Sequence, residues 1–358
     1  MRPDHINSDR SSILLIYTGG TIGMKVDPVL QALTPFDFDQ ILEEVPELSK
    51  FAYRIDSYTF DPLIDSSDVE PSLWIALADL IEERYSDYDG FVILHGTDTM
   101  AYSASALSFM IEGLTKPVIF TGSQLPIGIP RTDGKENLIS AVEIAAAKDD
   151  EGHAVVPEVC ICFDNVLIRG NRSRKINSDN FRAFRSENHP PLAEAGINIR
   201  YNTALIRKPE DWTSKPVFWK CLDTRVSILK IHPGITPQVV RNILCGPETR
   251  AVILETYGAG NAPSKDWFIS IVREASEKGK ILLNVTQCIA GSVNMDIYAT
   301  GKSLKSAGVI NGYDSTTESA LGKLFHLMGK TESNEEVKAE LERDLRGEIS
   351  KLLLSFGN

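Results

Sequence analysis

Short, almost wholly apolar runs that end in small polar residues constrain this chain most. The runs show no alternation of apolar and polar positions, which is typical of strands buried on both faces in a parallel sheet. Helical patterns between them predict helices over Pro71 to Tyr85 and Met100 to Ile111. Alternating strands and helices predict an α/β fold. The runs are Ser12–Tyr17, Phe91–Leu94, Val118–Phe120, Val159–Phe163, Val226–Leu229, Ala251–Leu254 and Ile281–Leu283.

The chain of 358 residues is long enough for two domains. The rhythm of strands and helices stops between Thr203 and Cys221. We therefore expect a larger N-terminal α/β domain (1–203), with a mostly parallel sheet flanked by helices. A linker (204–225) then leads to a smaller C-terminal α/β domain (226–358) with a parallel sheet. Near the C-terminus, Ser333-x-x-Glu336 predicts a capped helix that continues to Ile349.

Composition excludes several classes of partner. The net charge of −12 argues against nucleic acid or an anionic membrane, because both need a basic face. Five scattered cysteines, without a C-x-x-C pair, fit reduced thiols in the cytoplasm. The sequence has no H-E-x-x-H pair, no signal core and no apolar stretch near the ~20 residues that span a bilayer. We predict a cytoplasmic protein without metal, cofactor, nucleic-acid or membrane partner.

The glycine-rich segment Thr18–Gly23 directly follows the first predicted strand. Its glycines allow a tight turn and leave the Thr21 hydroxyl with little steric cover at the carboxyl end of the strand. Ligands bind beyond these ends in α/β sheets, so Thr21 is a candidate nucleophile if a base takes its proton. The spacing fits neither common phosphate-loop motif. A plain turn is the alternative.

The segment His95–Met100 repeats this arrangement after another strand. Thr97 supplies a second hydroxyl, and Asp98 a carboxylate that could hold an ammonium group. Both residues precede a predicted helix, whose free N–H groups favour developing negative charge. Capping of this helix by Asp98 or Thr99 is the alternative, but a cap does not explain a second threonine at a strand end.

Asp65, Ser66 and Ser67 could bind the charged ends of an amino acid, although helix capping would account for the neighbouring Asp68.

Two further polar segments are ambiguous when taken singly. Lys175 closes the basic run that starts at Arg169. Such a lysine is usually a solvated surface charge, but burial or nearby like charge lowers the pKa of a lysine so that it can accept a proton. Asn261 lies at the tip of the segment Tyr257–Pro263, which alone is simply a loop.

Together these segments resemble the bacterial-type L-asparaginase family, in particular its cytoplasmic (type I) branch. The ordered set spans nearly the whole chain, and this makes the resemblance specific. The matching motifs are T-G-G-T-I-G (Thr18–Gly23), D-S-S-D (Asp65–Asp68), H-G-T-D-T-M (His95–Met100), R-G-N-R-x-x-K (Arg169–Lys175), P-P-L-x-E-A-G-I (Pro190–Ile197), Y-G-x-G-N-A-P (Tyr257–Pro263) and N-G-Y-D-x-T-T-E (Asn311–Glu318).

The resemblance implies hydrolysis of the side-chain amide of L-asparagine to L-aspartate and ammonia, without metal or cofactor. Thr21 would form the acyl-enzyme ester. Thr97, Asp98 and Lys175 would support it, with Lys175 as the base toward Thr97, which positions or activates the attacking water. Backbone N–H groups near Thr21 and Thr97 would form the oxyanion hole.

The resemblance also implies how substrate and subunits meet. A neighbouring subunit would supply Asn261, so the protein would be a homodimer or homotetramer with active sites near the subunit interface. The residues expected to bind substrate are Asp65, Ser66, Ser67, Thr97, Asp98 and Asn261.

One departure concerns the loop after the first motif. Family members usually carry a tyrosine there that closes the site, whereas Met24 to Phe36 contains none. Either Tyr17, Tyr53 or Tyr58 acts differently, or another group closes the lid. The group that deprotonates Thr21 therefore stays open.

Two alternatives to an asparaginase are an amidase (ammonia-generating) subunit of a tRNA-dependent amidotransferase and a non-catalytic amino-acid sensor. The amidase subunit normally carries an additional N-terminal domain, which we expect to be absent because Thr21 lies so near the first strand. A sensor would need no paired hydroxyls with a lysine. Preference between asparagine and glutamine also stays open, because it depends on pocket dimensions.

The second departure predicts simple kinetics. Some type I members have an allosteric asparagine site, with an arginine near the Y-G-x-G-N motif and a small hydroxyl residue before the lysine. Glu255 and Arg174 stand at these positions, while Cys288 matches the pattern. Because one charge is reversed and space is filled, we expect the initial rate to depend hyperbolically on asparagine concentration. A Hill coefficient clearly above one would contradict this.

Overall fold

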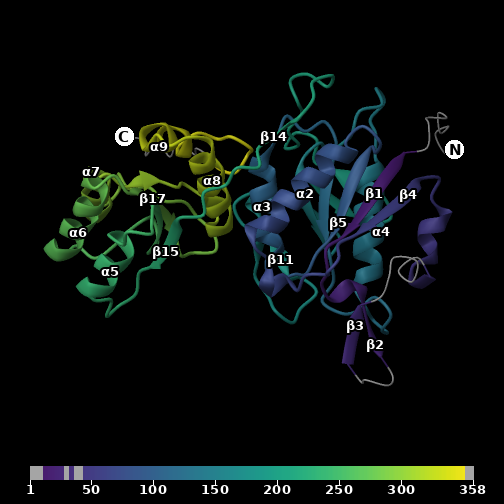
Figure 1. The fold of residues 1–358 in the computed structure, drawn as a ribbon, viewed down its shortest axis with the longest axis horizontal. Coiled ribbons are helices and arrows are strands. Elements are labelled where there is room, and N and C mark those ends of the chain that lie inside the picture. The colour runs from purple at the N-terminus through teal and green to yellow at the C-terminus, as the bar shows by residue number, and fades with distance from the viewer. Residues whose placement is uncertain (1–10, 28–31, 36–42, 351–358) are drawn as a thin grey trace. The chain divides into compact units, whose positions relative to one another are not determined.

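The computed structural model describes residues 11–27, 32–35 and 43–350 (Figure 1). The chain divides into two compact units, Met1–Ser186 with Pro190–Phe218 and Glu187–His189 with Trp219–Asn358. The extreme N-terminus and parts of the predicted tyrosine-free loop lie outside the described residues. The predicted domains 1–203 and 226–358, with their linker, stay a prediction.

A sheet of eight strands forms the first unit. The strands are β1 (Ser12–Tyr17), β4 (Arg54–Thr59), β5 (Gly90–Leu94), β7 (Val118–Thr121), β8 (Val159–Phe163), β9 (Val166–Arg169), β12 (Ala193–Ala195) and β13 (Ile199–Tyr201). Their order is β13-β12-β9-β8-β7-β5-β1-β4. The pairs from β4 to β8 are parallel, and those from β8 to β13 are antiparallel. The predicted mostly parallel sheet is confirmed.

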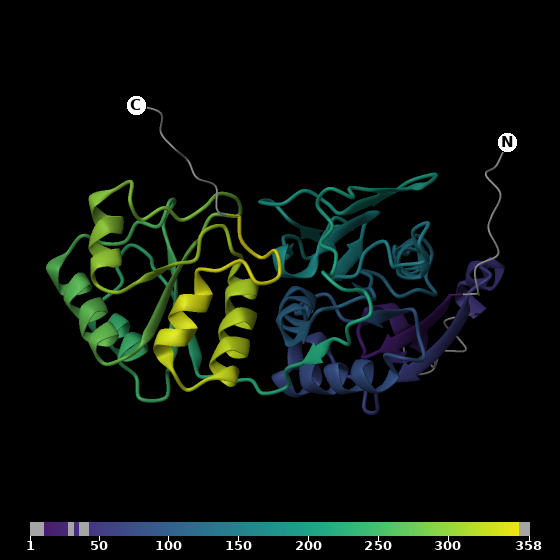
Figure 2. The same cartoon turned by 90° about the horizontal axis from the view of Figure 1, so that it is seen from above.

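Helices cover both faces of this sheet (Figure 2). They are α2 (Pro71–Arg84), α3 (Met100–Met110) and α4 (Gly134–Ala146), so the two predicted helices are confirmed. Ile13 and Leu15 on β1 belong to one core cluster with the apolar side of α4. On the other face Tyr85, at the end of α2, stacks on Phe91 of β5 with ring centroids 6.0 Å apart. The central strands β1, β5, β7 and β8 are therefore buried on both sides, which explains their unbroken apolar sequence.

Small strand pairs complete the first unit. They are β2 (Met24–Asp27) with β3 (Ala32–Pro35), β6 (Ile111–Glu112) with β14 (Val217–Phe218), and β10 (Arg174–Lys175) with β11 (Phe184–Arg185). The β2–β3 hairpin follows the T-G-G-T-I-G turn directly, and the sequence pattern did not predict it. The β6–β14 pair places Val217 and Phe218 of the irregular stretch in the first unit.

The second unit has a parallel sheet of four strands, as predicted. Its elements are β15 (Val226–Lys230), β16 (Ala251–Thr256), β17 (Ile281–Thr286), β18 (Ile310–Asn311), α5 (Pro237–Leu244), α6 (Asp266–Glu277), α7 (Ala299–Ser306), α8 (Thr317–Lys330) and α9 (Asn334–Leu341). On β16, Val252 and Leu254 pack with α5, α6 and α7, whereas Ala251 and Ile253 pack with α8 and α9. The helices again cover both faces of the sheet.

The predicted extension of the last helix is wrong. Ser333 caps α9 as expected, but the helix ends at Leu341. Beyond it the fully buried Glu348 carboxylate accepts the N–H of Leu345 at 3.0 Å and pairs with Lys323 Nζ at 2.6 Å. These contacts hold the segment in a turn, because a continued helix would give the Leu345 N–H to the carbonyl four residues earlier.

Candidate active site

The two threonine motifs meet at one point of the first sheet. Strand β1 lies between β4 and β5, so the chain crosses from one side of β1 to the other. Such a reversal creates a ligand-binding crevice at the carboxyl ends of the strands. Thr18 to Thr21 follow β1, and His95 to Asp98 follow β5. The structure therefore places both motifs at this edge.

Glycine contacts bring three motifs together. A Cβ atom on Gly20 would lie 2.5 Å from both Cα and N of Gly96, and a Cβ atom on Gly96 would lie 2.5 Å from Ser66 Oγ. The N–H and hydroxyl of Thr18 both donate to the Leu94 carbonyl, at 3.0 and 2.9 Å. Only glycine permits such close backbone approach. The turn that carries Thr21 is therefore packed directly against the one that carries Thr97.

Lys175 joins this site from a distant part of the sequence. Its Nζ donates to Thr97 Oγ1 at 2.8 Å and to Asp98 Oδ1 at 2.7 Å. The Lys175 side chain is only 18% exposed, whereas the Asp98 side chain is 62% exposed. The three residues form one polar group, with its carboxylate open to a ligand.

Gln124 is a member of this group that the sequence prediction missed. The Thr97 hydroxyl donates to Gln124 Oε1 at 3.2 Å. The Gln124 N–H is held by both carboxylate oxygens of Asp133 at 3.1 Å, and burial raises the pKa of Asp133. Gln124 follows β7, the neighbour of β5. The strand-end rule that selected Thr21 and Thr97 applies to Gln124 as well.

The acidic motif forms a short turn beside these residues. Asp65 Oδ1 accepts the N–H and the hydroxyl of Ser67, both at 2.8 Å, and these bonds lower the pKa of Asp65. The buried Ser66 hydroxyl accepts the Asp98 N–H at 3.3 Å. Asp65 and Ser67 are exposed, so their polar atoms are accessible to a ligand.

The capping alternatives are wrong for the two helices. Glu70, not Asp68, occupies the N-cap position of α2, and its side chain makes no capping bond. Thr99 occupies that position in α3, but its hydroxyl donates to the Ser66 carbonyl at 2.7 Å. Capping therefore does not explain Asp68, Asp98 or Thr99, whereas Asp65 caps the short 3-10 turn Ser66–Asp68 by accepting the Ser67 N–H.

The three tyrosines outside the loop have different environments. Tyr17 is buried, desolvation raises its pKa, and a Cβ atom on Gly23 would lie 2.2 Å from its hydroxyl oxygen. Tyr53 stacks on Phe51 at 5.2 Å. Tyr58 is 42% exposed on the edge strand β4. Tyr17 thus supports the Thr21 turn from the core and is not a mobile lid.

Asn261 belongs to the second unit, so it is not among the residues brought together in the first. Its Oδ1 accepts the Thr300 hydroxyl at 2.7 Å, and its carbonyl accepts the Tyr257 N–H at 2.9 Å. The loop is therefore closed on itself within its own unit.

Glu255, the residue of reversed charge, is buried in the second unit. Its carboxylate accepts the Thr317 hydroxyl at 2.6 Å and lies 3.7 Å from Lys230 Nζ. These neighbours satisfy the carboxylate inside the unit.

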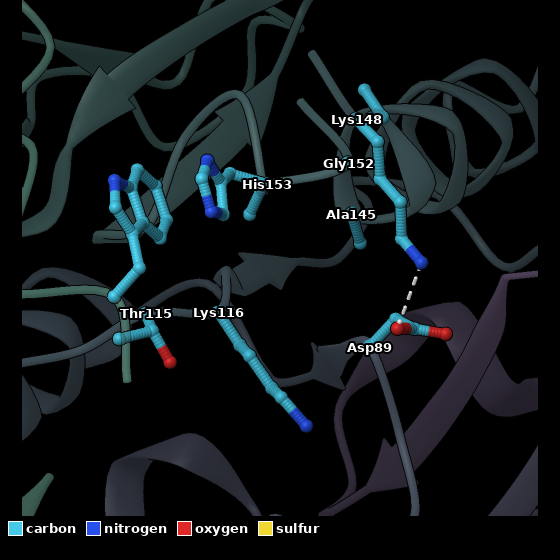
Figure 3. A pocket seen from close by; sticks show the side chains of 10 residues that line it. Asp89, Thr115, Lys116, Ala145, Lys148, Gly152 and His153 are labelled. Atoms are coloured by element: carbon cyan, nitrogen blue, oxygen red, sulfur yellow. Dashed lines mark ion pairs between the residues drawn. The ribbon is translucent and has the colours of Figure 1, made fainter. Parts of the chain in front are cut away.

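A pocket of about 160 Å³ lies elsewhere in the first unit (Figure 3). Asp89 and Lys116, which line it, precede β5 and β7, so it lies toward the amino ends of the strands. Lys148 pairs with Asp89 at 3.0 Å, and the His153 ring stacks on Trp212 at 4.3 Å. These side chains are engaged with one another, and the pocket is remote in topology from the threonine motifs.

Neither a metal cluster nor a membrane span is found within residues 11–27, 32–35 and 43–350. No group of three or more His, Cys, Asp and Glu residues there could hold a metal ion. No helix there has both the length and the apolar character needed to cross a bilayer.

Family models match both halves of the chain. The model described as "Asparaginase, N-terminal" matches residues 12–207, and "Glutaminase/Asparaginase C-terminal domain" matches residues 225–341. The chain belongs to the asparaginase family. The family predicted from the motifs is thereby confirmed.

Relatives of this asparaginase-family chain include enzymes of two kinds. It is 44% identical to L-asparaginase 1 of Escherichia coli, covering 95% of this chain and 98% of that protein. The crystal structure of L-asparaginase I from Vibrio cholerae matches with a TM-score of 0.86 and 45% identity, over 96% of this chain and 100% of that one. The chain is also 34% identical to a glutamyl-tRNA(Gln) amidotransferase subunit of Methanopyrus kandleri, covering 94% of this chain and 75% of that one.

The glycine contact predicts a selective loss of activity. Gly20 has a φ of +93°, and Gly113 has a φ of +74° with nothing within 4 Å of the place that a Cβ atom would take. Replacing either with alanine adds backbone strain of about 1–3 kcal/mol. Gly20→Ala also forces the two turns apart, so we expect a larger loss of unfolding free energy and a fall in kcat of roughly 100-fold.

Gly113→Ala is the control for strain alone, and urea unfolding with steady-state assays makes the comparison. Equal stability and equal kcat in the two variants would contradict a role for this contact.

Proposed function

We propose that this chain hydrolyses the side-chain amide of L-asparagine to L-aspartate and ammonia. The observation that carries the proposal is the contact of Lys175 Nζ with both Thr97 Oγ1 and Asp98 Oδ1, at 2.8 and 2.7 Å, beside the Thr21 turn. The 44% identity to L-asparaginase 1 of Escherichia coli, over nearly the full chain, supports the same reaction.

The reaction proceeds in two acyl-transfer steps. In the first, Thr21 Oγ bonds to the amide carbon, the C–N bond breaks, and the Thr21 proton leaves with the nitrogen as ammonia. In the second, water held by Thr97 attacks the ester, the bond to Thr21 Oγ breaks, a proton from the water returns to Thr21 Oγ, and L-aspartate is released. Lys175 acts as the base toward Thr97. Backbone N–H groups near Thr21 and Thr97 stabilise the negative oxygen of each tetrahedral intermediate.

The charged ends of the substrate meet polar groups of the acidic motif and of Asp98. The open carboxylate of Asp98 and that of Asp65 bind the α-ammonium group, because each presents an oxygen at the surface of the site. Ser66 and Ser67 contact the α-carboxylate end. These assignments follow the family motif at each position.

The two alternatives have weaker support. The relation to the amidotransferase subunit is more distant, at 34% identity and 75% coverage of that protein. A non-catalytic sensor would have no use for a lysine bonded to a threonine hydroxyl. Asparagine hydrolysis accounts both for the higher identity to L-asparaginase 1 and for the hydrogen bond between Lys175 and Thr97.

We also propose a cytoplasmic location and a homodimeric or homotetrameric assembly. All five cysteines are unpaired, which fits a reducing compartment. In the assembly Asn261 completes the active site of a neighbouring subunit.

Removing the nucleophile tests the reaction. We expect Thr21→Ala to lower kcat for asparagine by at least about 1,000-fold, because no other hydroxyl replaces the attacking oxygen. Thr21→Ser, which keeps a hydroxyl, should retain a measurable part of the activity. Ammonia release is measured, with circular dichroism to verify the fold. Release by Thr21→Ala at near the original rate would refute the assignment.

Hybrid assemblies test the position of Asn261. Thr21→Ala and Asn261→Ala chains are co-expressed with different tags, and the mixed assembly is isolated. If Asn261 acts across the interface, each mixed pair holds one complete active site, so activity returns well above that of either parent. Mixed pairs no more active than their parents would show that Asn261 does not act in a neighbour, as would full activity of Asn261→Ala alone.

A further inference from the structure

The buried histidine His95 lies next to the turn that carries Thr97. It has no role in the reaction described so far. His95 follows β5 and is completely buried. Its Nδ1 lies 2.7 Å from the Gly96 carbonyl oxygen, and its Nε2 lies 3.0 Å from Ser103 Oγ. Ser103 Oγ in turn accepts a hydrogen bond from Trp74 Nε1 at 2.9 Å. The chain of contacts runs from α2 through α3 to the backbone of the site.

The donors and acceptors of this chain can have only one direction. The Gly96 carbonyl oxygen can only accept, so the ring proton lies on His95 Nδ1, and Nδ1–H donates to that oxygen. In the neutral ring Nε2 then accepts the Ser103 hydroxyl, whose oxygen also accepts the Trp74 indole N–H. Burial lowers the pKa of His95 to about 4, so the ring is neutral at physiological pH. One tautomer is therefore enforced.

This bond fixes the orientation of the next N–H. A trans peptide is planar, so its C=O and N–H point in opposite directions. Because the Gly96 carbonyl is held toward His95, the Thr97 N–H points away from the buried ring. In the described part of the chain that N–H has no acceptor. The following N–H, of Asp98, is already bonded to Ser66 Oγ.

The peptide at this position needs such a restraint. Gly96 precedes it, and glycine tolerates a wide range of backbone angles, so the Gly96–Thr97 peptide could rotate. Gly96 cannot be replaced without collision, because a Cβ atom there would lie 2.5 Å from Ser66 Oγ. Close packing therefore requires glycine at position 96, and glycine restricts the backbone angles less than any other residue would. The hydrogen bond from His95 supplies the missing restraint on the peptide.

We propose that His95 is a positioning residue, which locks the Gly96–Thr97 peptide so that the Thr97 N–H faces the oxyanion of the reacting amide. The inference rests on the proposed hydrolysis and deepens it. A donor aimed in advance stabilises the charge that develops in the transition state more than it stabilises the bound substrate. Loss of the lock should therefore lower kcat and leave KM nearly unchanged.

A matched pair of variants separates this role from packing. Leucine and asparagine have nearly the same shape, so His95→Leu and His95→Asn leave similar cavities. Only asparagine keeps an N–H near the place of Nδ1, where it can donate to the Gly96 carbonyl. We expect His95→Leu to lower kcat by about 10- to 100-fold, with KM changed less than about 2-fold. His95→Asn should recover most of kcat, although both variants melt at lower temperature.

Ser103→Ala is a milder variant for the case in which the His95 variants fail to fold. It removes the hydrogen bond that Nε2 accepts, so the ring is held less firmly against the Gly96 carbonyl. We expect kcat to fall again without a matching rise in KM. A Ser103→Ala enzyme with wild-type kcat, or equal kcat in His95→Leu and His95→Asn, would overturn the positioning role.

Failure of the two proposals can be told apart. The wild-type protein and Thr21→Ala test the hydrolysis itself, without any change at His95. If the wild type releases ammonia and Thr21→Ala does not, the proposed function stands whatever the His95 variants show. If the wild type releases none, the proposed function fails, and with it the role assigned to His95.

Discussion

The site depends on a contact between two backbones. Gly20 and Gly96 approach so closely that a single added carbon would lie 2.5 Å from backbone atoms. The contact sets the distance between the Thr21 turn and the Thr97 turn, and so the space in which an amide could lie between two hydroxyls. Side chains can adjust by rotation, but these backbone atoms cannot. The sheet order makes the contact possible, because it places β1 beside β5.

The same constraint explains the layers of hydrogen bonds around the turns. Glycine allows the two turns to approach closely but restricts the backbone angles little. The peptides of the turns therefore need hydrogen-bond partners from other parts of the chain to hold their orientation. Ser66 serves the peptide of Asp98, and His95 serves the carbonyl of Gly96. The Thr97 hydroxyl is held by two hydrogen bonds: it accepts one from Lys175 Nζ and donates one to Gln124 Oε1. Rigidity at the site thus comes from outside the turns themselves.

Sequence patterns predicted what is local. Unbroken apolar runs located the central strands, since each is buried on both faces, and small residues at their ends located Thr21 and Thr97. The last helix was predicted too long, because the apolar period continues past Leu341 while the buried Glu348–Lys323 pair ends the helix. No period in the sequence encodes a pair that forms between α8 and the chain after α9. The β2–β3 hairpin was also missed, because each of its strands has only four residues, too few for a clear period in the sequence.

The contribution of Lys175 shows where pattern and chemistry divide. Among basic residues in the sequence it could be a surface charge or a base, and the family motif decided for the second. Its place on the short strand β10 brings Nζ to the end of β5, more than seventy residues away in sequence. His95 went unnoticed for the opposite reason, because the motif drew attention to Thr97 and Asp98, which carry the chemistry. A residue that acts through a carbonyl oxygen leaves no signal in residue types, and only the direction of its hydrogen bonds discloses it.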